Sequence, residues 1–473
     1  MKGAAAAREM RYAQIMVVVA FSLLLFALLR FVVFHSTFFY DDLDAFLAIK
    51  RLPLGRFLVL PIDVHFVPLQ RFFSYLVLKI DPLDFTLAVG VMAIFQILAV
   101  LMLYLLMQEI YATPYNLLVV GVYAVQHFLL PVLSWWSAGM HRLPYLFLAI
   151  SSMYFYARWR STGRWFFLSL STLSFILAFG FYEKAVLIPC YLAGFELMRF
   201  EGKRDQYFRV NVGYLVAMLG MSMLYVLWYL LLSPVLHFSG HMSVIMALLM
   251  LKLQFIHLVA QLLLLRESLH GFLPIVAATL VFLVLLFVSL RKSRMALYIG
   301  VGVFWLFLNF AVIDFQSRSQ IFGLFLALAP RYFYESFFLL CIVAAFIFKA
   351  LAVTTNNHRE FIFWALIALL YSGLGEVFGE HAYLCGYNAS VNLAHVYMHR
   401  VYHEFDALHG RQVTVLDTKL PRTVFGVFVE QPIFMSKILV MRYQNISFTH
   451  SPAAAEYTVD AQGYLIRLQR PRS

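Results

Sequence analysis

The chain has 473 residues, of which 63% are hydrophobic and 13% are charged, and its formal net charge is +12. A soluble globular protein carries about 25% charged residues because its surface faces water, so this composition excludes soluble, disordered, collagen-like and disulfide-scaffold proteins. The basic residues stand in short clusters between apolar runs, as membrane topology requires, so the positive charge does not indicate a nucleic-acid partner.

Long apolar runs predict a polytopic α-helical membrane protein with about eleven transmembrane helices. The first run follows Lys2, Arg8 and Arg11, and no small-residue cleavage site comes after it, so we expect an uncleaved span with a cytoplasmic N-terminus. The expected spans are residues 15–34, 85–107, 117–133, 143–157, 165–179, 185–198, 214–232, 272–290, 296–313, 337–353 and 361–374. Residues 242–265 contain several polar side chains and predict an amphipathic helix lying on the membrane surface.

The basic clusters give the orientation of these spans. When the sides alternate along the chain, residues 158–164, 199–209, 291–294 and 358–359 fall on the cytoplasmic side, and all four segments carry basic residues. This agrees with the positive-inside rule. The connection at residues 108–115 falls on the same side and carries no basic residue. The other polar clusters, and everything after residue 375, are therefore expected on the outer side.

The last hundred or so residues differ in composition from the rest. They contain no apolar run long enough to span a membrane; residues 390–408 predict a helix that ends at Gly410, and residues 412–416, 423–429, 437–442 and 464–468 resemble strands. We therefore expect two domains: a transmembrane module over residues 1–375 and a small extracytoplasmic α+β domain over residues 376–473.

The first outer loop holds two adjacent carboxylates, Asp41 and Asp42, followed by His65 and Arg71. Carboxylates at a membrane surface are costly unless they are solvated, paired or metal-bound. Adjacent carboxylates also couple their titrations, which raises one apparent pKa. A plain alternative is a hydrated loop in which an aspartate caps a short helix.

Three further outer segments hold candidate residues. Trp135, His141 and Arg142 stand in the second loop, where an aromatic belt and a snorkelling arginine are the alternatives. Glu183 and Lys184 interrupt an apolar stretch, and a local ion pair is their plain explanation. Arg331 and Tyr332 directly precede a later span, where an interfacial arginine is the alternative, although arginine is also suited to bidentate phosphate recognition.

One carboxylate pair, several cations and two histidines are thus expected to face the same compartment beside lipid. Transfer from a lipid-phosphate donor fits this set, because phosphate is already a good leaving group and needs no general acid. The protein then has to supply a base for the acceptor hydroxyl and positive charge for the departing phosphate.

The ordered motifs resemble those of the GT-C superfamily of polytopic glycosyltransferases, which use polyprenyl-phosphate sugars. The resemblance covers residues 38–335 or so, and its motifs match an acidic pair, an H-x-x-P-L-x-R-like element, a tryptophan-containing loop, an E-K element before a proline and a late R-Y-x-Y element. The matching residues are Asp41 and Asp42, His65 to Arg71, Trp135 to Arg142, Glu183 and Lys184 with Pro189, and Arg331 to Tyr334.

The resemblance also implies roles for these residues. Asp42, or else Asp41, would be the catalytic base, with Asp42 preferred as the more internal carboxylate. Lys184 and Arg331 would hold the donor phosphate. The second candidates for that phosphate are Arg142, His65 and Arg71; the supporting residues are Glu183, which would orient Lys184, together with His141 and Tyr332. Inversion at the anomeric carbon is implied in the same way.

The expected function is therefore transfer of a sugar from a polyprenyl-phosphate donor to a hydroxyl of a glycan, lipid or protein on the extracytoplasmic face of a bacterial inner membrane. A divalent cation occurs in some family members but is not favoured here, because two vicinal carboxylates alone make a poor Mg²⁺ or Mn²⁺ site. The main alternative is a multispan lipid or glycan transporter or flippase, which usually has charged groups near span centres and repeated halves. A multispan acyltransferase and a scaffold for the outer domain are further alternatives.

Overall fold

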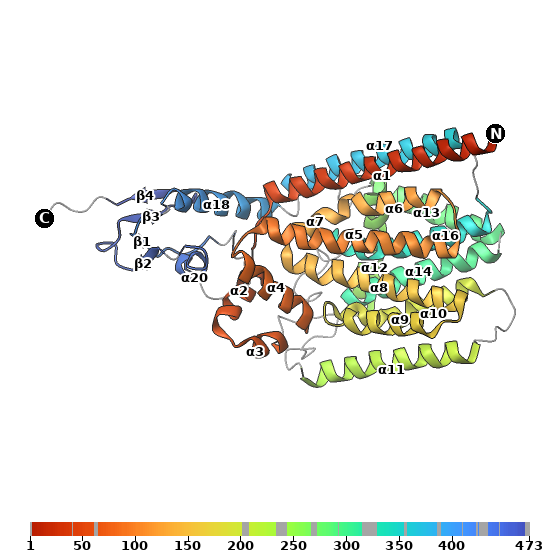
Figure 1. Cartoon of the computed structure of the whole chain (residues 1–473), viewed down its shortest axis with the longest axis horizontal. Coiled ribbons are helices and arrows are strands. Elements are labelled where there is room, and N and C mark those ends of the chain that lie inside the picture. Colours follow the sequence, from red (N-terminus) through yellow and green to blue (C-terminus); the bar gives the residue numbers. More distant parts are fainter. Residues whose placement is uncertain are drawn as a thin grey trace.

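Apolar helices run side by side along the long axis of the molecule, and the C-terminal elements lie beyond one end of them (Figure 1). The computed structural model describes residues 2–39, 41–60, 65–200, 208–232, 244–265, 272–291, 293–314, 329–353, 357–385, 389–408, 410–421, 424, 434–443 and 445–468. Along the chain, the first helices are α1 (Lys2–His35), α2 (Asp41–Arg51), α3 (Leu54–Val59), α4 (Pro68–Ile80), α5 (Phe85–Ile110), α6 (Tyr115–Val125), the 3₁₀ helix η1 (His127–Leu129) and α7 (Leu130–Leu133). The later helices are α8 (Trp136–Thr162), α9 (Trp165–Ala178), the 3₁₀ helix η2 (Glu183–Leu187), α10 (Ile188–Arg199), α11 (Phe208–Leu232), α12 (Val244–Leu262), α13 (Phe272–Arg291), α14 (Ser293–Asp314), α16 (Arg331–Ala350) and α17 (His358–Cys385).

Seven of the described helices are long and apolar enough to cross a membrane. They coincide with the predicted spans at residues 15–34, 85–107, 117–133, 214–232, 296–313, 337–353 and 361–374. The chain is therefore a polytopic α-helical membrane protein. The other four predicted spans fall on α8, α9, α10 and α13, which are helical, and their crossing of the membrane stays a prediction.

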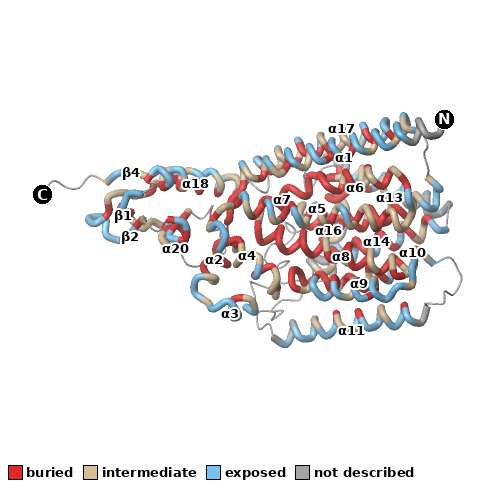
Figure 2. The backbone as a smooth tube through the Cα atoms, in the orientation of Figure 1, coloured by how far each residue is buried: buried red, intermediate tan, exposed pale blue. Residues whose placement is uncertain are grey.

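The centre of the bundle and its rim differ in what they expose (Figure 2). Helix α8 is largely buried, whereas α11 on the rim exposes large apolar side chains such as Met223 and Leu224. Contiguous exposed apolar surface of this kind marks contact with a membrane. The rim helices therefore face lipid, and the central helices carry the packed core.

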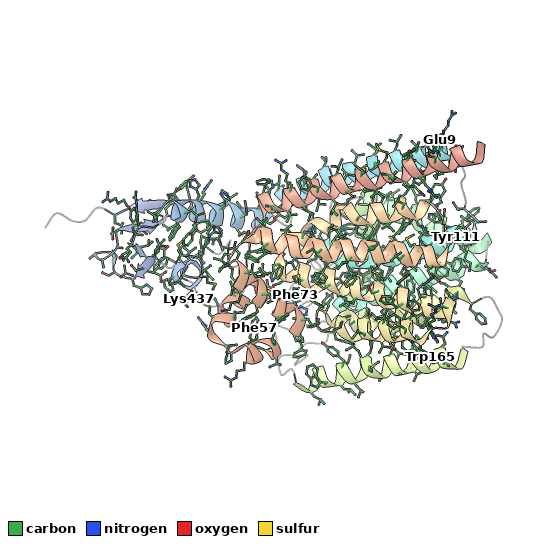
Figure 3. All side chains as sticks on the ribbon, viewed as in Figure 1. Glu9, Phe57, Phe73, Tyr111, Trp165 and Lys437 are labelled. Carbon is green, nitrogen blue, oxygen red and sulfur yellow. The ribbon has the colours of Figure 1, made fainter. Side chains whose placement is uncertain are left out.

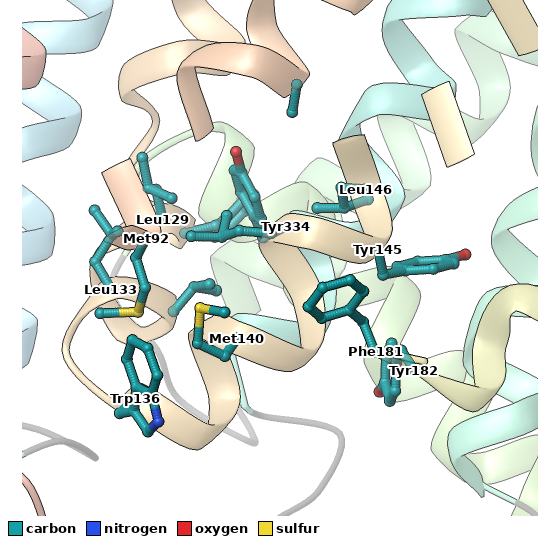
Figure 4. Close-up of a cluster of buried hydrophobic side chains, with 14 of the residues drawn as sticks. Met92, Leu129, Leu133, Trp136, Met140, Tyr145, Leu146, Phe181, Tyr182 and Tyr334 are labelled. Atoms are coloured by element: carbon teal, nitrogen blue, oxygen red, sulfur yellow. The ribbon is translucent and has the colours of Figure 1, made fainter. Parts of the chain in front are cut away.

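A tightly packed core joins the start of α8 to α5 (Figure 4). Gly139 of α8 lies so close to Met92 of α5 that a Cβ at this position would overlap the Met92 sulfur. Trp136 is fully buried, and its indole Nε1 donates a hydrogen bond to Ser74 Oγ of α4 at 2.9 Å. The first turns of α8 are consequently held in a fixed position, which matters for the polar residues they carry.

Helices α8 and α10 run in the same direction. Near their beginnings, the Tyr145 hydroxyl donates to the carbonyl oxygen of Lys184 at 3.4 Å, and near their ends Arg160 Nε lies 2.9 Å from Glu196 Oε1. Helices α5 and α16 share this direction, because Glu109 and Lys349 close to their C-terminal ends line one cavity with Ser161 near the end of α8. One end of the bundle thus collects several helix N-termini, and the opposite end collects C-termini.

The predicted surface helix at residues 242–265 is wrong in its placement. Within this range, α12 packs against α13 and α14, and its polar side chains Gln254, His257 and Gln261 are buried rather than directed to lipid head groups. The reason is a polar partner inside the bundle, since His127 Nε2 and Gln261 Oε1 are 2.9 Å apart. The amphipathic pattern predicts a polar stripe along this helix, but it does not predict the direction in which the stripe faces.

The C-terminal elements form a small sheet with two helices beside it. They are α18 (Ala389–Asp406), β1 (Val413–Leu416), α20 (Met435–Leu439), β2 (Ile446–Thr449), β3 (Tyr457–Val459) and β4 (Leu465–Arg467). The strand order is β2-β1-β3-β4, in which β1 is parallel to both of its neighbours and β3 is antiparallel to β4.

Several predictions for this tail can be compared with the observed elements. The strands expected at residues 412–416 and 464–468 correspond to β1 and β4, and the helix at 390–408 to α18. The strand expected at 437–442 is wrong, because Asp417 accepts hydrogen bonds from Ser436 N at 2.9 Å and Ser436 Oγ at 2.6 Å and so fixes the start of α20. The strand expected at 423–429 falls almost entirely outside the described residues, and the boundary expected at residue 375 lies inside α17.

Candidate functional site

The two adjacent aspartates point in different directions. Asp42 is fully buried, and its Oδ1 accepts hydrogen bonds from Ser137 N at 2.8 Å and Ser137 Oγ at 2.6 Å. Burial, together with the nearby charge of Asp41, raises the pKa of Asp42 well above its ordinary 3.8, although the Ser137 hydrogen bonds oppose this shift. Asp42 therefore fastens α2 to the first turn of α8 and does not line the polar cavity described next.

Asp41 is the carboxylate that lines that cavity. Its Oδ1 accepts a hydrogen bond from the indole Nε1 of Trp135 at 2.9 Å. The polar cavity is lined by Asp41, His65, Trp135, Ser137, Ala138, His141, Arg142, Tyr182 and Arg331. Of the pair, Asp41 lines the polar cavity, whereas Asp42, the carboxylate preferred from the sequence, makes a structural contact with Ser137.

The polar cavity lies where helices begin. Asp41 is the first residue of α2, Trp135 is the N-cap of α8, and Arg331 is the first residue of α16. Unpaired N–H groups and the helix dipole make such positions favourable for anions. Segments that are far apart in the sequence thus bring positive potential and two guanidinium groups to one place.

Arg331 and Trp135 form one wall of the polar cavity. The guanidinium carbon of Arg331 lies 4.7 Å from the ring centre of Trp135 and 5.2 Å from that of Tyr332. Trp135 also holds Asp41, so one aromatic side chain positions both a carboxylate and a cation of the cavity. Tyr332 is buried and lies behind this wall rather than lining it.

Glu335, a fully buried carboxylate outside the predicted set, contacts Arg142 of the polar cavity. Its Oε1 is 2.5 Å from Arg142 Nε, and its Oε2 forms an ion pair with Lys184 Nζ. Lys184 is also fully buried, and its Nζ lies 3.4 Å from Asn309 Oδ1. One carboxylate therefore bridges two cations, on α8 and η2, and α14 completes the cluster.

This ion cluster changes the role of Lys184. Lys184 does not line the polar cavity, and its ammonium is already paired with Glu335. Burial lowers the pKa of Lys184, while the charge of Glu335 opposes the shift. Arg142 is the member of the cluster that reaches the polar cavity, so Lys184 supports Arg142 through Glu335.

Glu183 is placed differently from the prediction as well. Its Oε2 is 2.9 Å from His65 Nδ1, and its Oε1 accepts a hydrogen bond from the backbone N–H of Phe66 at 2.9 Å. Glu183 consequently orients His65 and not Lys184. The His65 ring also lies 4.8 Å, centre to centre, from the ring of His141, so both histidines stay at the polar cavity.

Arg71, like Lys184, is a predicted phosphate ligand that does not line the polar cavity. Its Nη1 donates to the carbonyl oxygen of Phe57 at 3.0 Å, and its guanidinium stacks on the Phe57 ring at 4.7 Å. Burial lowers the pKa of Arg71 to about 10. Arg71 thus fastens α4 to α3, and the sequence spacing alone did not reveal this.

An apolar groove adjoins the polar cavity. It has a volume of about 500 Å³ and is lined by Phe66, Pro68, Leu69, Phe175, Ile176, Leu177, Phe179, Gly180, Met221, Tyr225 and Trp228. Phe66 of the groove directly follows His65 of the cavity, and Gly180 lies two residues before Tyr182. The same two segments therefore separate an ionic compartment from an apolar one.

The polar cavity itself is narrow, with a volume of about 20 Å³, which is room for about one water molecule. Any larger ligand needs the lining side chains to separate. Among the described residues, no group of three or more His, Cys, Asp or Glu side chains is arranged to hold a metal ion. No model of a known protein family matches the sequence, and a search of curated proteins finds no match either.

Proposed function

We propose that the protein is a GT-C-type membrane glycosyltransferase that moves a sugar from a polyprenyl-phosphate donor to an acceptor hydroxyl of a glycan, lipid or protein. The observation that carries the proposal is the convergence of Asp41 with Arg142 and Arg331 at helix N-termini, next to an apolar groove. An ionic site beside an apolar surface matches a ligand that has a phosphate and a long hydrocarbon chain.

The proposed reaction uses this arrangement in one displacement. The acceptor oxygen attacks the anomeric carbon while the bond from that carbon to the phosphate oxygen breaks, and the electron pair stays on the phosphate. Asp41 takes the proton of the acceptor hydroxyl. Arg142 and Arg331 stabilise the charge that develops on the departing phosphate. Attack from the face opposite the phosphate inverts the anomeric centre.

The remaining residues of the site have supporting roles in this proposal. Glu335 and Lys184 hold the Arg142 guanidinium, and Glu183 holds His65 beside the donor phosphate. The prenyl chain occupies the apolar groove. No step of the proposed reaction is assigned to a divalent cation.

The proposed topology follows from the same assignment. The chain crosses a bacterial inner membrane about eleven times with its N-terminus in the cytoplasm. The polar cavity and the C-terminal α+β elements then lie on the extracytoplasmic side. The tail packs near the cavity, since α20 contacts α2, which begins with Asp41.

Asp41→Asn tests the proposal, with Asp44→Asn as its matched control. Both aspartates belong to the first turn of α2, but Asp44 is exposed and does not line the polar cavity. The purified protein is incubated with polyprenyl phosphates that carry a pentose, a hexose or an amino sugar, and the release of polyprenyl phosphate is measured. We expect Asp41→Asn to slow release at least about 100-fold and Asp44→Asn to leave it close to wild type.

Two outcomes count against a transferase. Release at the wild-type rate in Asp41→Asn contradicts the assigned base. Movement of the intact donor across vesicle membranes without any cleavage identifies the alternative function, a lipid or glycan flippase.

A further inference from the structure

A second charged cavity, the basic cavity, lies at the opposite end of the bundle from the polar cavity. It has a volume of about 110 Å³ and is lined by Glu109, Ile110, Ala157, Ser161, Phe195, Arg199, Phe346 and Lys349. These residues come from the last turns of α5, α8, α10 and α16. Figure 3 shows this end of the bundle by the labelled side chains Tyr111 and Trp165, far from Phe57 and Lys437 beside the C-terminal elements.

The single carboxylate of this basic cavity is already neutralised. Glu109 Oε2 forms an ion pair with Arg158 Nη1 at 2.9 Å, and Glu109 Oε1 accepts a hydrogen bond from Ser161 Oγ at 2.5 Å. Two further cations, Arg199 and Lys349, line the cavity. Among the described residues that line the cavity, Arg199 and Lys349 are the cations and Glu109 is the carboxylate.

Arg199 is half-buried, and its guanidinium forms neither an ion pair nor a hydrogen bond with the described residues. The C-terminal ends of the helices favour cations here, which explains basic residues but not a cavity between them. A guanidinium group that is directed into a cavity without a protein partner is suited to a phosphate oxygen.

The surroundings of the basic cavity are apolar and exposed. Leu197 and Phe200 of the α10 end, and Leu351 just after α16, are large hydrophobic residues on the surface. Such residues contact acyl chains when the head-group region of a membrane lies at this level. Basic pockets between transmembrane helices commonly bind anionic lipid head groups.

We propose that this basic cavity binds a phosphate group, as carried by an anionic phospholipid or by a soluble phosphate. Arg199 and Lys349 contact the phosphate oxygens. The proposal is independent of the glycosyltransferase assignment, because it shares no residue with the polar cavity.

Native mass spectrometry of the full-length protein tests this site. The protein is released from nanodiscs that contain phosphatidylglycerol or phosphatidylcholine, and retained lipids are counted with and without inorganic phosphate. We expect phosphatidylglycerol to be retained in preference to phosphatidylcholine, and Arg199→Gln and Lys349→Gln each to reduce its retention about tenfold. Arg164→Gln is the matched control, because Arg164 is an exposed basic residue just before α9 that does not line the basic cavity.

The other outcomes either identify the source of the phosphate group or overturn the proposal. Binding of inorganic phosphate without lipid retention, if lost in Arg199→Gln, supports the site and identifies a soluble phosphate as its ligand. Equal loss of lipid in all three variants means diffuse surface charge and overturns the proposal. Retention of neither probe by a wild-type protein that elutes as a folded species on size exclusion also overturns it.

Discussion

Replacing Glu335 by glutamine removes the charge that two buried cations share. Glu335 and Lys184 are fully buried, and the side chain of Arg142 is 5% exposed. Removing one partner of a buried ion pair costs about 3–5 kcal/mol, because the remaining charge stays desolvated without compensation. Since both cations lose their carboxylate here, we expect Glu335→Gln to fall in the upper part of that range.

The pH dependence of this variant follows from Lys184. Burial already lowers the pKa of Lys184, and the loss of Glu335 removes the charge that opposes the shift. Between the lowered pKa of Lys184 and the ordinary lysine pKa of 10.5, the folded state then binds fewer protons than the unfolded state. Stability therefore rises with pH in this window, and the gap between Glu335→Gln and wild type should narrow as the pH is raised.

Thermal unfolding of the purified protein in detergent, followed by tryptophan fluorescence at several pH values, measures both effects. Glu376→Gln is the matched control, because Glu376 is also buried in a long apolar helix but has no ion pair in the described part of the chain. Adding Lys184→Met to Glu335→Gln should recover part of the lost stability. If Glu335→Gln unfolds like Glu376→Gln, the reasoning on the shared carboxylate is refuted.

Three more predictions concern the site. Asp42→Asn should flatten the pH dependence of stability. The folded wild type keeps the Asp42 proton above pH 3.8, so its stability falls as the pH rises through the raised pKa of Asp42. Thermal unfolding from about pH 4 to 9 measures this dependence, and an unchanged slope contradicts the prediction. Arg331→Gln should raise the KM for the polyprenyl-phosphate donor about tenfold or more, whereas an unchanged KM would remove Arg331 from the donor site. Trp228→Ala should raise the same KM with little change in kcat, while Leu231→Ala, which is 83% exposed on the same helix and does not line the groove, should leave it unaltered; equal effects would argue against a chain in the groove.

Much of the site could be predicted from residue type and side of the membrane. Asp41, His65, His141, Arg142 and Arg331 were all expected on one side, and they line one cavity. Polar side chains that interrupt apolar sequence are costly, so their presence is informative even without an alignment.

The partners of these residues were not predictable in the same way. Glu335 follows Arg331 by four residues, but the apolar run predicts a span that begins only at residue 337, whereas α16 begins at Arg331. An ionisable residue in the first turns of a membrane helix was the available signal. Glu183 was assigned to its sequence neighbour, but it contacts His65, which is 118 positions away in the chain.

Composition and the spacing of apolar runs were enough to establish a polytopic helical membrane protein, because a lipid environment requires long helices whose backbone groups are satisfied internally. The pairing of buried charges was decided by tertiary structure alone. Adjacent aspartates have the same sequence context, yet packing of α2 on α8 buries Asp42 against Ser137 and leaves Asp41 at the polar cavity. The direction of a side chain, and thus its desolvation and its partners, depends on helix packing that no local sequence pattern contains.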